Sequence, residues 1–317
     1  MEKIVANAYN NYHFHSVSTQ NHRTVYQLSS PAGHGTMECR EVLPGIQISY
    51  NCLNMENCFQ NIRNTRHTWQ IDFCHKGCYE WEVNKNTRLF LGEGMTSVMA
   101  LNKIRFKSSR IPLRYFEGIS IFLEPERVQP VLDREFSGSH IQLMHLESAL
   151  CLSDRPFLLR PLTETRQIFQ DINRARTEKD PAYLWLKTVE LLLLLSQLHL
   201  PGAEYLRSFS AETEKGTREI YEYLRIHPLC DLSLRDLCGA FHVSESSVQR
   251  CFKYITGKSV GVFRKEKRME EASRFLQSGM TVGETAAHVG YSNHSKFTEA
   301  FKSVFHQTPS SYQGLGS

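Results

Sequence analysis

Residues 232–253 read LSLRDLCGAFHVSESSVQRCFK, and a second version of the pattern follows 48 positions later at residues 280–302, MTVGETAAHVGYSNHSKFTEAFK. One extra residue after Tyr291 shifts the offset by one, so that Val248 and Phe252 correspond to Phe297 and Phe301. Each version predicts a short apolar helix, a sharp turn and a second helix. This order of elements is that of a helix-turn-helix motif.

Each copy begins with a capping box, Ser233-x-x-Asp236 in the first and Thr281-x-x-Glu284 in the second. In such a box the hydroxyl and the carboxylate satisfy backbone N–H groups that have no partner at a helix start. The boxes therefore fix where the first helix of each motif begins.

The sharp turn falls at His242 in the first copy and at Gly290 in the second, both residue types that enter left-handed backbone conformations more readily than most. A second helix is expected from Ser244 and from near Ser292, with its apolar residues on one side. Such a helix keeps one face on the core and leaves the other free for a DNA groove. The apolar residues are Val248, Cys251, Phe252, Phe297, Ala300 and Phe301.

Residues 260–277 predict one long helix that connects the two motifs. If both second helices face the same side of a duplex, they enter major grooves about one turn, roughly 34 Å, apart. An all-helical core without a ligand is the alternative, and the connector's basic residues could simply form a solvated face. The predicted inward residues are Val262, Phe263, Met269, Ala272 and Leu276, and the predicted basic outer run is Arg264, Lys265, Lys267 and Arg268.

Residues 216–312 resemble the AraC/XylS type of bacterial transcription regulators. The resemblance rests on the connector FRKEKRMEEASRFL and on the closing stretch GYSNHSKFTEAFKSVFHQTPSSY. Its Gly-Tyr-Ser turn, Phe-x-x-x-Phe-Lys helix and Thr-Pro-x-x-Tyr ending are highly specific. The resemblance implies a cytoplasmic regulator that binds double-stranded DNA, and that also contacts RNA polymerase if it is an activator.

The same resemblance implies which residues face the bases. An arginine can bond guanine bidentately, glutamine suits adenine, and hydroxyls serve either base edge. Glu299 departs from the family, where many relatives carry a basic residue; its carboxylate could accept from cytosine or point away from the phosphates. The base-facing set is Ser246, Gln249, Arg250, His294, Ser295, Thr298 and Glu299, and the expected phosphate contacts are Lys253, Lys302 and the helix starts at Ser233 and Thr281.

The N-terminal half predicts antiparallel strands between about residues 37 and 122. Trp69, Ile71 and Phe73 alternate onto one face, and a second alternation, Tyr79, Trp81 and Val83, follows a turn at Gly77. The stretch CHKGCYEWEV, followed by LGEGM, resembles the sensing half of the family, a cupin-like barrel. The expected fold is therefore α+β, with a cupin-like antiparallel barrel and helices followed by an all-α domain.

A barrel of this size can hold one small-molecule effector in its mouth. The predicted lining residues are Trp69, Tyr79, Glu80 and Trp81; alternatively, the aromatic side chains fill the core and the carboxylates face water. No His-x-His pair with a glutamate occurs between His67 and Glu93, so no cofactor or catalytic set is predicted. The remaining alternatives are a cupin-type enzyme or metal-binding barrel fused to the DNA-binding domain, and a regulator without any effector.

Two weak metal-ligand patterns occur in this half. Cys74-x3-Cys78 lacks a closely spaced second pair, because only Cys52 and Cys58 are nearby in sequence. The pair at positions 13 and 15, His-x-His, has no carboxylate near it and favours a solvated segment. No metal is therefore predicted.

Two helices are expected at residues 162–176 and 181–197, the second with Asp180 as its cap and Pro181 at its first position. The second is apolar around most of its surface and must be covered by the barrel or by another subunit. The resemblance implies a homodimer here, and packing within a single chain is the alternative. The predicted organisation is a sensing domain at 1–161, a helical dimerisation region at 162–198, a linker at 199–213 and a DNA-binding domain at 214–317.

Composition agrees with two soluble domains. The 317 residues leave room for two cores, and the net charge of +4 favours a defined docking surface over a basic tail. No signal peptide or spanning helix is recognisable, which predicts a cytoplasmic protein. Nine cysteines, an odd number, are expected to be free thiols in that compartment. The sequence thus predicts a ligand-responsive transcription regulator without catalytic activity.

Overall fold

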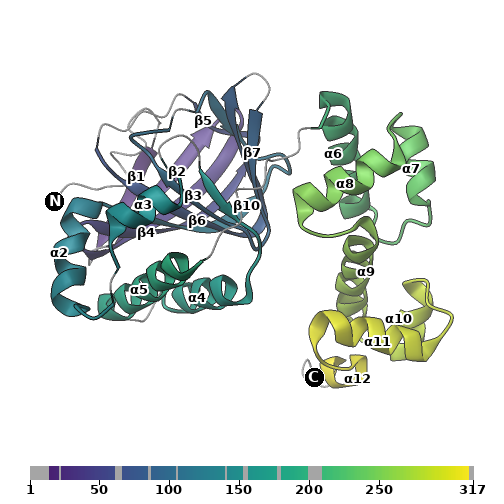
Figure 1. The fold of residues 1–317 in the computed structure, drawn as a ribbon. Coiled ribbons are helices and arrows are strands. Elements are labelled where there is room, and N and C mark those ends of the chain that lie inside the picture. Colours follow the sequence, from purple (N-terminus) through teal and green to yellow (C-terminus); the bar gives the residue numbers. More distant parts are fainter. Residues whose placement is uncertain are drawn as a thin grey trace. The chain divides into compact units, whose positions relative to one another are not determined.

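The chain folds into two compact units, Met1–Ser208 and Phe209–Ser317, in a computed structural model (Figure 1). Each unit is taken by itself below. The described residues are 14–20, 23–60, 66–84, 87–104, 106–139, 141–152, 156–176, 180–198 and 209–313. Most of the predicted linker at 199–213 lies outside them, as does His13.

The first unit is built on antiparallel strands whose main order is β1-β2-β3-β4-β10-β6-β8-β11. Strands β5 and β9 pair with each other, and both β9 and β7 pair with β6. The strands are β1 Phe14–Gln20, β2 Arg23–Ser30, β3 Gly33–Leu43, β4 Ile46–Met55, β5 Asn57–Gln60, β6 Trp69–Asn84, β7 Thr87–Gly92, β8 Thr96–Ala100, β9 Ser108–Arg110, β10 Phe116–Leu123 and β11 Phe157–Leu159.

The sheet buries both of its faces. One face carries alternate residues such as Ile48, Ile121 and Trp69, which belong to a cluster shared with helices. The other face carries Met37, Phe122 and their neighbours, which form a second cluster made by strands and the loops between them. Alternation along each strand therefore separates a helix-covered face from an inner face, as the period of two requires.

The predicted closed barrel is wrong for the described residues. In that part of the chain β1 pairs only with β2, and β11 pairs only with β8, so the two ends of the strand order do not meet. The alternation identified the faces correctly, but it contains no information about which strands form the edges. The coarser prediction of an antiparallel β domain within an α+β chain is confirmed.

Gly77 also differs from the prediction. It does not form a turn between two strands, because β6 runs without interruption from Trp69 to Asn84. The pairing of β6 with β10 shifts register between Glu117 and Gly118, opposite this point. Gly77 has a φ of +78°, and a Cβ there would lie 2.0 Å from the carbonyl oxygen of Tyr115. It therefore permits a bulge, after which β6 pairs with β7 and β9.

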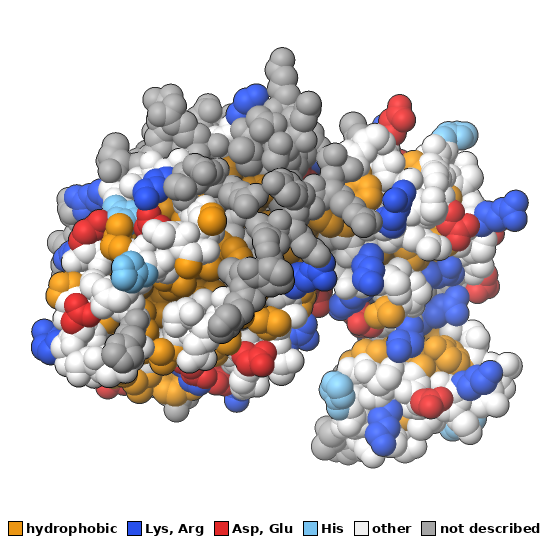
Figure 2. Space-filling view, viewed as in Figure 1, with side chains coloured by type: hydrophobic (Ala, Val, Ile, Leu, Met, Phe, Trp, Pro, Cys, Tyr) orange, Lys and Arg blue, Asp and Glu red, His pale blue; other side chains and the backbone are white. Residues whose placement is uncertain are grey.

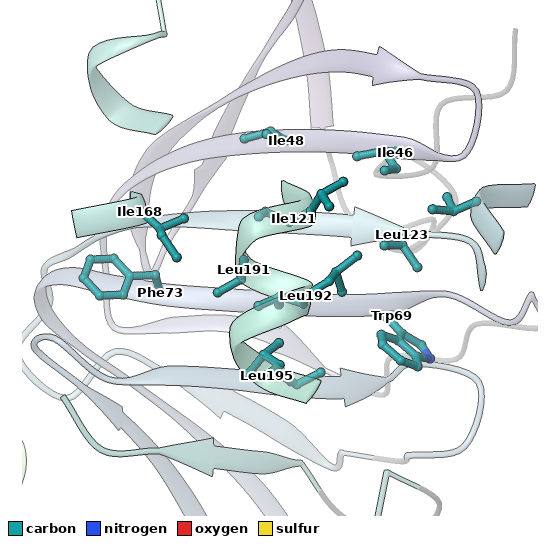
Figure 3. Close-up of a cluster of buried hydrophobic side chains, with 14 of the residues drawn as sticks. Ile46, Ile48, Trp69, Phe73, Ile121, Leu123, Ile168, Leu191, Leu192 and Leu195 are labelled. Carbon is teal, nitrogen blue, oxygen red and sulfur yellow. The ribbon is translucent and has the colours of Figure 1, made fainter. Parts of the chain in front are cut away.

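Four helices complete the part of the first unit that the structure describes. The predicted pair is observed as α4 and α5, and the N-cap Asp180 accepts a hydrogen bond from the Ala182 amide at 2.9 Å. Helices α2 and α3 were not predicted. Figure 3 shows Leu191, Leu192 and Leu195 of α5 directed at the sheet. The helices are α2 Pro125–Glu135, α3 Leu143–Ala149, α4 Thr163–Arg174 and α5 Pro181–Gln197.

The second unit is helical throughout its described residues. In Figure 1, α9 lies between one group formed by α6 to α8 and another formed by α10 to α12. The connector helix is observed at the predicted residues, although Val262 is 42% exposed and was wrongly assigned to the inward face. The helices are α6 Ala211–Ile226, α7 Leu234–Ala240, α8 Glu245–Thr256, α9 Val260–Gln277, α10 Val282–His288, α11 His294–Phe305 and α12 Pro309–Gln313.

Candidate nucleic-acid interface

Both predicted capping boxes are confirmed. Ser233 Oγ accepts from the Asp236 amide at 3.2 Å, while the Asp236 carboxylate accepts from the Ser233 amide at 2.9 Å. Thr281 and Glu284 make the same pair of bonds, at 3.3 and 3.0 Å. Hydrogen bonds from the hydroxyl and the backbone stabilise each carboxylate, and they lower the pKa of Asp236 and of Glu284.

The turns between the paired helices adopt the expected left-handed conformation. His242 has a φ of 55° and Gly290 a φ of 82°. The following amides close the turns, since Val243 donates to the Cys238 carbonyl at 3.0 Å and Tyr291 donates to the Ala286 carbonyl at 2.9 Å. Helices α8 and α11 therefore begin at equivalent places in the two motifs.

Each motif has its own apolar core. Val248 and Phe252 of α8 pack with Ile220 of α6 and with the first part of α9. Phe297 and Phe301 of α11 pack with Met269, Leu276 and other residues from the second part of α9. The connector helix α9 thus contributes to both cores, and both α8 and α11 pack against it.

The outer face of α8 is polar and exposed. Ser246, Gln249 and Arg250 are all exposed there. Two of them bond within the helix, since Gln249 donates to the Glu245 carboxylate at 3.1 Å and Arg250 donates to the Ser246 carbonyl at 3.2 Å. The structure thus brings the three predicted base-facing residues of the first motif to one surface.

The corresponding face of α11 has a different composition. His294, Ser295 and Glu299 are exposed, and Thr298 is half-buried. The N-cap Asn293 accepts from the Lys296 amide at 3.0 Å, a cap that α8 lacks at Ser244. Exposed Lys296 stands beside this set but was absent from the prediction, which followed positions implied by family resemblance. The predicted phosphate contacts Ser233, Lys253, Thr281 and Lys302 are exposed.

The connector's basic run is only partly directed at solvent. Figure 2 shows Lys and Arg side chains gathered along this part of the surface. Arg264 donates to the carbonyls of Leu232 and Cys230 at 2.8 and 2.7 Å, and Arg268 donates to the Cys230 carbonyl at 3.1 Å. These two arginines tie α9 to the loop before α7. Lys267 is bonded to Glu270 at 2.6 Å and is half-buried.

The four predicted effector residues do not surround one space. Tyr79 and Trp81 line a cavity of about 30 Å³ on the inner face of the sheet. Trp69 lies on the helix-covered face, where its indole N–H donates to Glu147 at 2.7 Å. Glu80 is bound by Arg110 through two bonds of 2.8 and 3.1 Å.

The small inner cavity has a polar side. Asp72 is buried there and accepts from Gln70 at 2.8 Å and from Ser120 at 2.6 Å. Burial raises the pKa of Asp72 to about 6, although the hydrogen bonds oppose this shift.

Within the described ranges, no group of three or more His, Cys, Asp or Glu side chains is arranged to hold a metal ion. Cys74 and Cys78 are both buried. Burial raises the pKa of the Cys74 thiol well above its ordinary value, which disfavours the thiolate that binds metals. Of the helices that the structure describes, none has the length and apolar character needed to cross a membrane.

Two capped helix-turn-helix motifs on a shared connector define a class of DNA-binding domain, and sequence comparison agrees. Residues 237–314 match the family model described as a helix-turn-helix domain. An uncharacterised helix-turn-helix-type transcriptional regulator of Staphylococcus aureus (strain COL) is 28% identical over 123 residues, 38% of this chain and 16% of that protein. The transcriptional regulator Rob of Salmonella typhimurium is 28% identical over 97 residues, 30% of this chain and 34% of Rob.

Residues 237–314 thus match a helix-turn-helix domain, and the aligned parts of both relatives belong to transcriptional regulators. The chain spans only 16% of the length of the S. aureus relative and 34% of the length of Rob. Most of each relative therefore lies outside the alignment. The helix-turn-helix domain predicted from the sequence is confirmed by the match over residues 237–314.

Two solved structures show weaker likeness. ToxT from Vibrio cholerae O395, bound to (E)-4-(8-methylnaphthalen-1-yl)but-3-enoic acid, aligns over 86% of this chain and 100% of ToxT, with a TM-score of 0.36 and 13% identity. The DNA-binding domain of AdpA, in complex with a target DNA, aligns over 32% of this chain and 91% of that domain, with a TM-score of 0.30 and 19% identity. Neither likeness is close enough to carry an argument about this chain.

Proposed function

We propose that this chain is a sequence-specific DNA-binding transcription regulator whose binding responds to a small molecule held by the N-terminal unit. One observation carries the first half of this proposal. Two helices with exposed polar faces, α8 and α11, are each preceded by a capped helix and a left-handed turn, and both are anchored on α9. This is the arrangement in which a recognition helix enters a major groove.

The proposed roles follow from side-chain chemistry. Arg250 bonds a guanine edge and Gln249 an adenine edge, after each gives up its bond within α8. In α11, His294, Ser295 and Thr298 face the second groove, and Glu299 accepts from cytosine. Lys253, Lys302 and the helix starts at Ser233 and Thr281 position the domain on phosphates without specifying sequence.

Regulation requires that the effector bind two arrangements of the protein with different affinities. We place the effector in the N-terminal unit. Of the four residues that the sequence suggested, Tyr79 and Trp81 line a common cavity, whereas Trp69 and Glu80 do not line it.

A second copy of the chain is the proposed partner. Leu186 of α5 is 54% exposed, and Leu193 and Leu194 of the same helix are half-buried, which supports a dimer contact on this helix. If the protein is an activator, RNA polymerase is a further partner.

The test is footprinting of the full chain on DNA upstream of its own gene and the neighbouring genes, with a random duplex as control and salt varied. Protection of two adjacent major grooves, much tighter than binding to the random duplex, is the expected result. Binding that is equally strong on both duplexes at every salt concentration would reject sequence-specific recognition.

A further inference from the structure

The first unit contains a second and larger cavity, away from the inner face. It has a volume of about 510 Å³ and lies between the helix-covered face of β4, β10 and β6 and the C-terminal end of α4. Small-molecule sites commonly have about 300–1,000 Å³. The inner cavity of about 30 Å³ has room for roughly one water molecule. The larger cavity, called the α4 pocket below, is therefore the better place for an organic ligand.

The floor of the α4 pocket is apolar and largely aromatic. Tyr50, Ile119 and Phe73 form one row across the three strands, because Ile119 pairs with Tyr50 on one side and with Phe73 on the other. Phe169 of α4 stacks on Phe73 with ring centroids 4.6 Å apart and an interplanar angle of 9°. The Tyr50 hydroxyl donates to the Ile172 carbonyl at 3.1 Å, which holds that ring in place. A flat apolar group fits such a floor.

The α4 side of the pocket carries two guanidinium groups. Arg174 donates to Asp171 at 2.8 Å through Nη2, and its side chain is 70% exposed. Arg176 binds Glu38 through Nε and Nη2, at 2.8 and 2.7 Å. A guanidinium has five N–H donors, so both arginines retain donors for a ligand. Glu38 also forms an ion pair with Arg23 at 2.6 Å, so one carboxylate balances the charges of two guanidinium groups.

Another part of the lining carries a carboxylate, which repels an acid. Glu117 lies there, accepting from the Tyr115 hydroxyl at 2.8 Å, with Lys76 Nζ at 4.0 Å. His75 stands beside it on the bulged part of β6. A ligand acid is therefore directed to the arginine side, while a hydrogen-bond donor on the same ligand is favoured near Glu117.

We propose that the α4 pocket binds a small organic acid with a flat apolar body, the body on the Phe73 and Phe169 rings and the acid on Arg174 and Arg176. This inference rests on the proposed function, since it names the site and the chemical class of the effector. Asp171 binds Arg174 and is also 2.9 Å from Lys187 of α5. A ligand acid that draws Arg174 away therefore changes a contact between α4 and α5.

The test measures binding of indole-3-acetate to the full chain by calorimetry, with indole-3-acetamide as the uncharged probe of the same shape. We expect the acid to bind about 10-fold or more tightly than the amide, because charge-assisted bonds to guanidinium are the stronger ones. Arg174→Gln and Arg176→Gln should each remove most of this preference and leave amide binding unchanged. Arg134→Gln, an exposed arginine of α2 outside the pocket, is the matched control and should have no effect.

Equal binding of acid and amide, no binding of either probe, or an acid preference that survives both pocket substitutions would overturn the inference. If Arg176→Gln fails to fold, Arg174→Gln alone still tests the inference, because the Arg174 side chain is mostly exposed and its loss should not unfold the protein. The footprint described above separates the two proposals. A protein that protects specific DNA yet fails this binding test remains a regulator, with a different effector or site.

Discussion

The two helix-turn-helix motifs share a backbone design but differ in the side chains that they present. Each has a capping box, a left-handed turn and a core built against α9. The turn residue is histidine in the first and glycine in the second, and the outer face of α8 offers Arg250 where α11 offers Glu299. The duplicated features are therefore those that fix helix ends, whereas the surfaces available for reading DNA differ between the two motifs.

The largest expected effect tests whether the two cores are separate. Phe252→Ala and Phe301→Ala each remove a fully buried ring, which should lower the free energy of unfolding by about 3–5 kcal/mol. Hydrogen exchange of the full chain should show protection lost first in α6–α8 for Phe252→Ala and in α10–α12 for Phe301→Ala. Equal loss in both groups for either variant would mean that α9 joins them into one cooperative unit.

The next effect concerns the reading surfaces. Arg250→Ala should weaken binding to the specific site by about 1–3 kcal/mol and relax specificity at one base pair. Glu299→Ala should cost less, since a carboxylate near phosphates brings repulsion along with any bond to cytosine. Titrations against the footprinted site and single-base variants measure both. If Arg250→Ala weakens random and specific DNA equally, its role is a phosphate contact.

Substitutions at the two turn residues should change the free energy of unfolding in opposite directions. Gly290→Val places a β-branched residue at a φ of 82° and should destabilise by roughly 1–2 kcal/mol or more. His242→Gly relieves a similar strain but adds glycine's entropy in the unfolded chain, leaving a net gain below about 1 kcal/mol. Chemical denaturation of both variants gives the comparison. A destabilising His242→Gly would show that the imidazole has a contact that outweighs the strain.

A small effect, alike in the two motifs, is expected at the caps. Ser233→Ala and Thr281→Ala should each cost about 1 kcal/mol. The pKa values of Asp236 and Glu284 are lower in the folded state than in the unfolded chain. Their contribution is therefore present near neutral pH and is lost as the pH falls below about 4. Thermal melts between pH 7 and pH 3 should show a smaller acid loss in each alanine variant than in the parent.

Local signals predicted the second unit well. The capping boxes, His242, Gly290 and the limits of α9 depend on nearby residues, and all are observed as expected. Val262 was wrongly assigned to the buried face because it is adjacent to buried Phe263. Near a helix start, hydrophobic periodicity alone does not distinguish between two neighbouring residues. Strand alternation likewise gave the faces of the first unit but not its edges. The α4 pocket combines residues 50, 73, 119 and 169–176, and no local pattern connects such distant positions.

Arg264 and Arg268 fix the first half of α9 to the loop before α7. The length of α9, which has 18 residues, therefore determines where α11 lies relative to the first motif. Inserting one residue into the second half of this helix turns α11 by about 100° about the axis and moves it by about 1.5 Å. Seven inserted residues return the rotation to within about 20° of its starting value while adding about 10 Å. The connector therefore sets both the angular phase and the separation of the two recognition helices. A heptad insertion keeps the phase but adds about 10 Å, and because major grooves recur on one face of DNA only about every 34 Å, we expect it to abolish protection of two adjacent grooves.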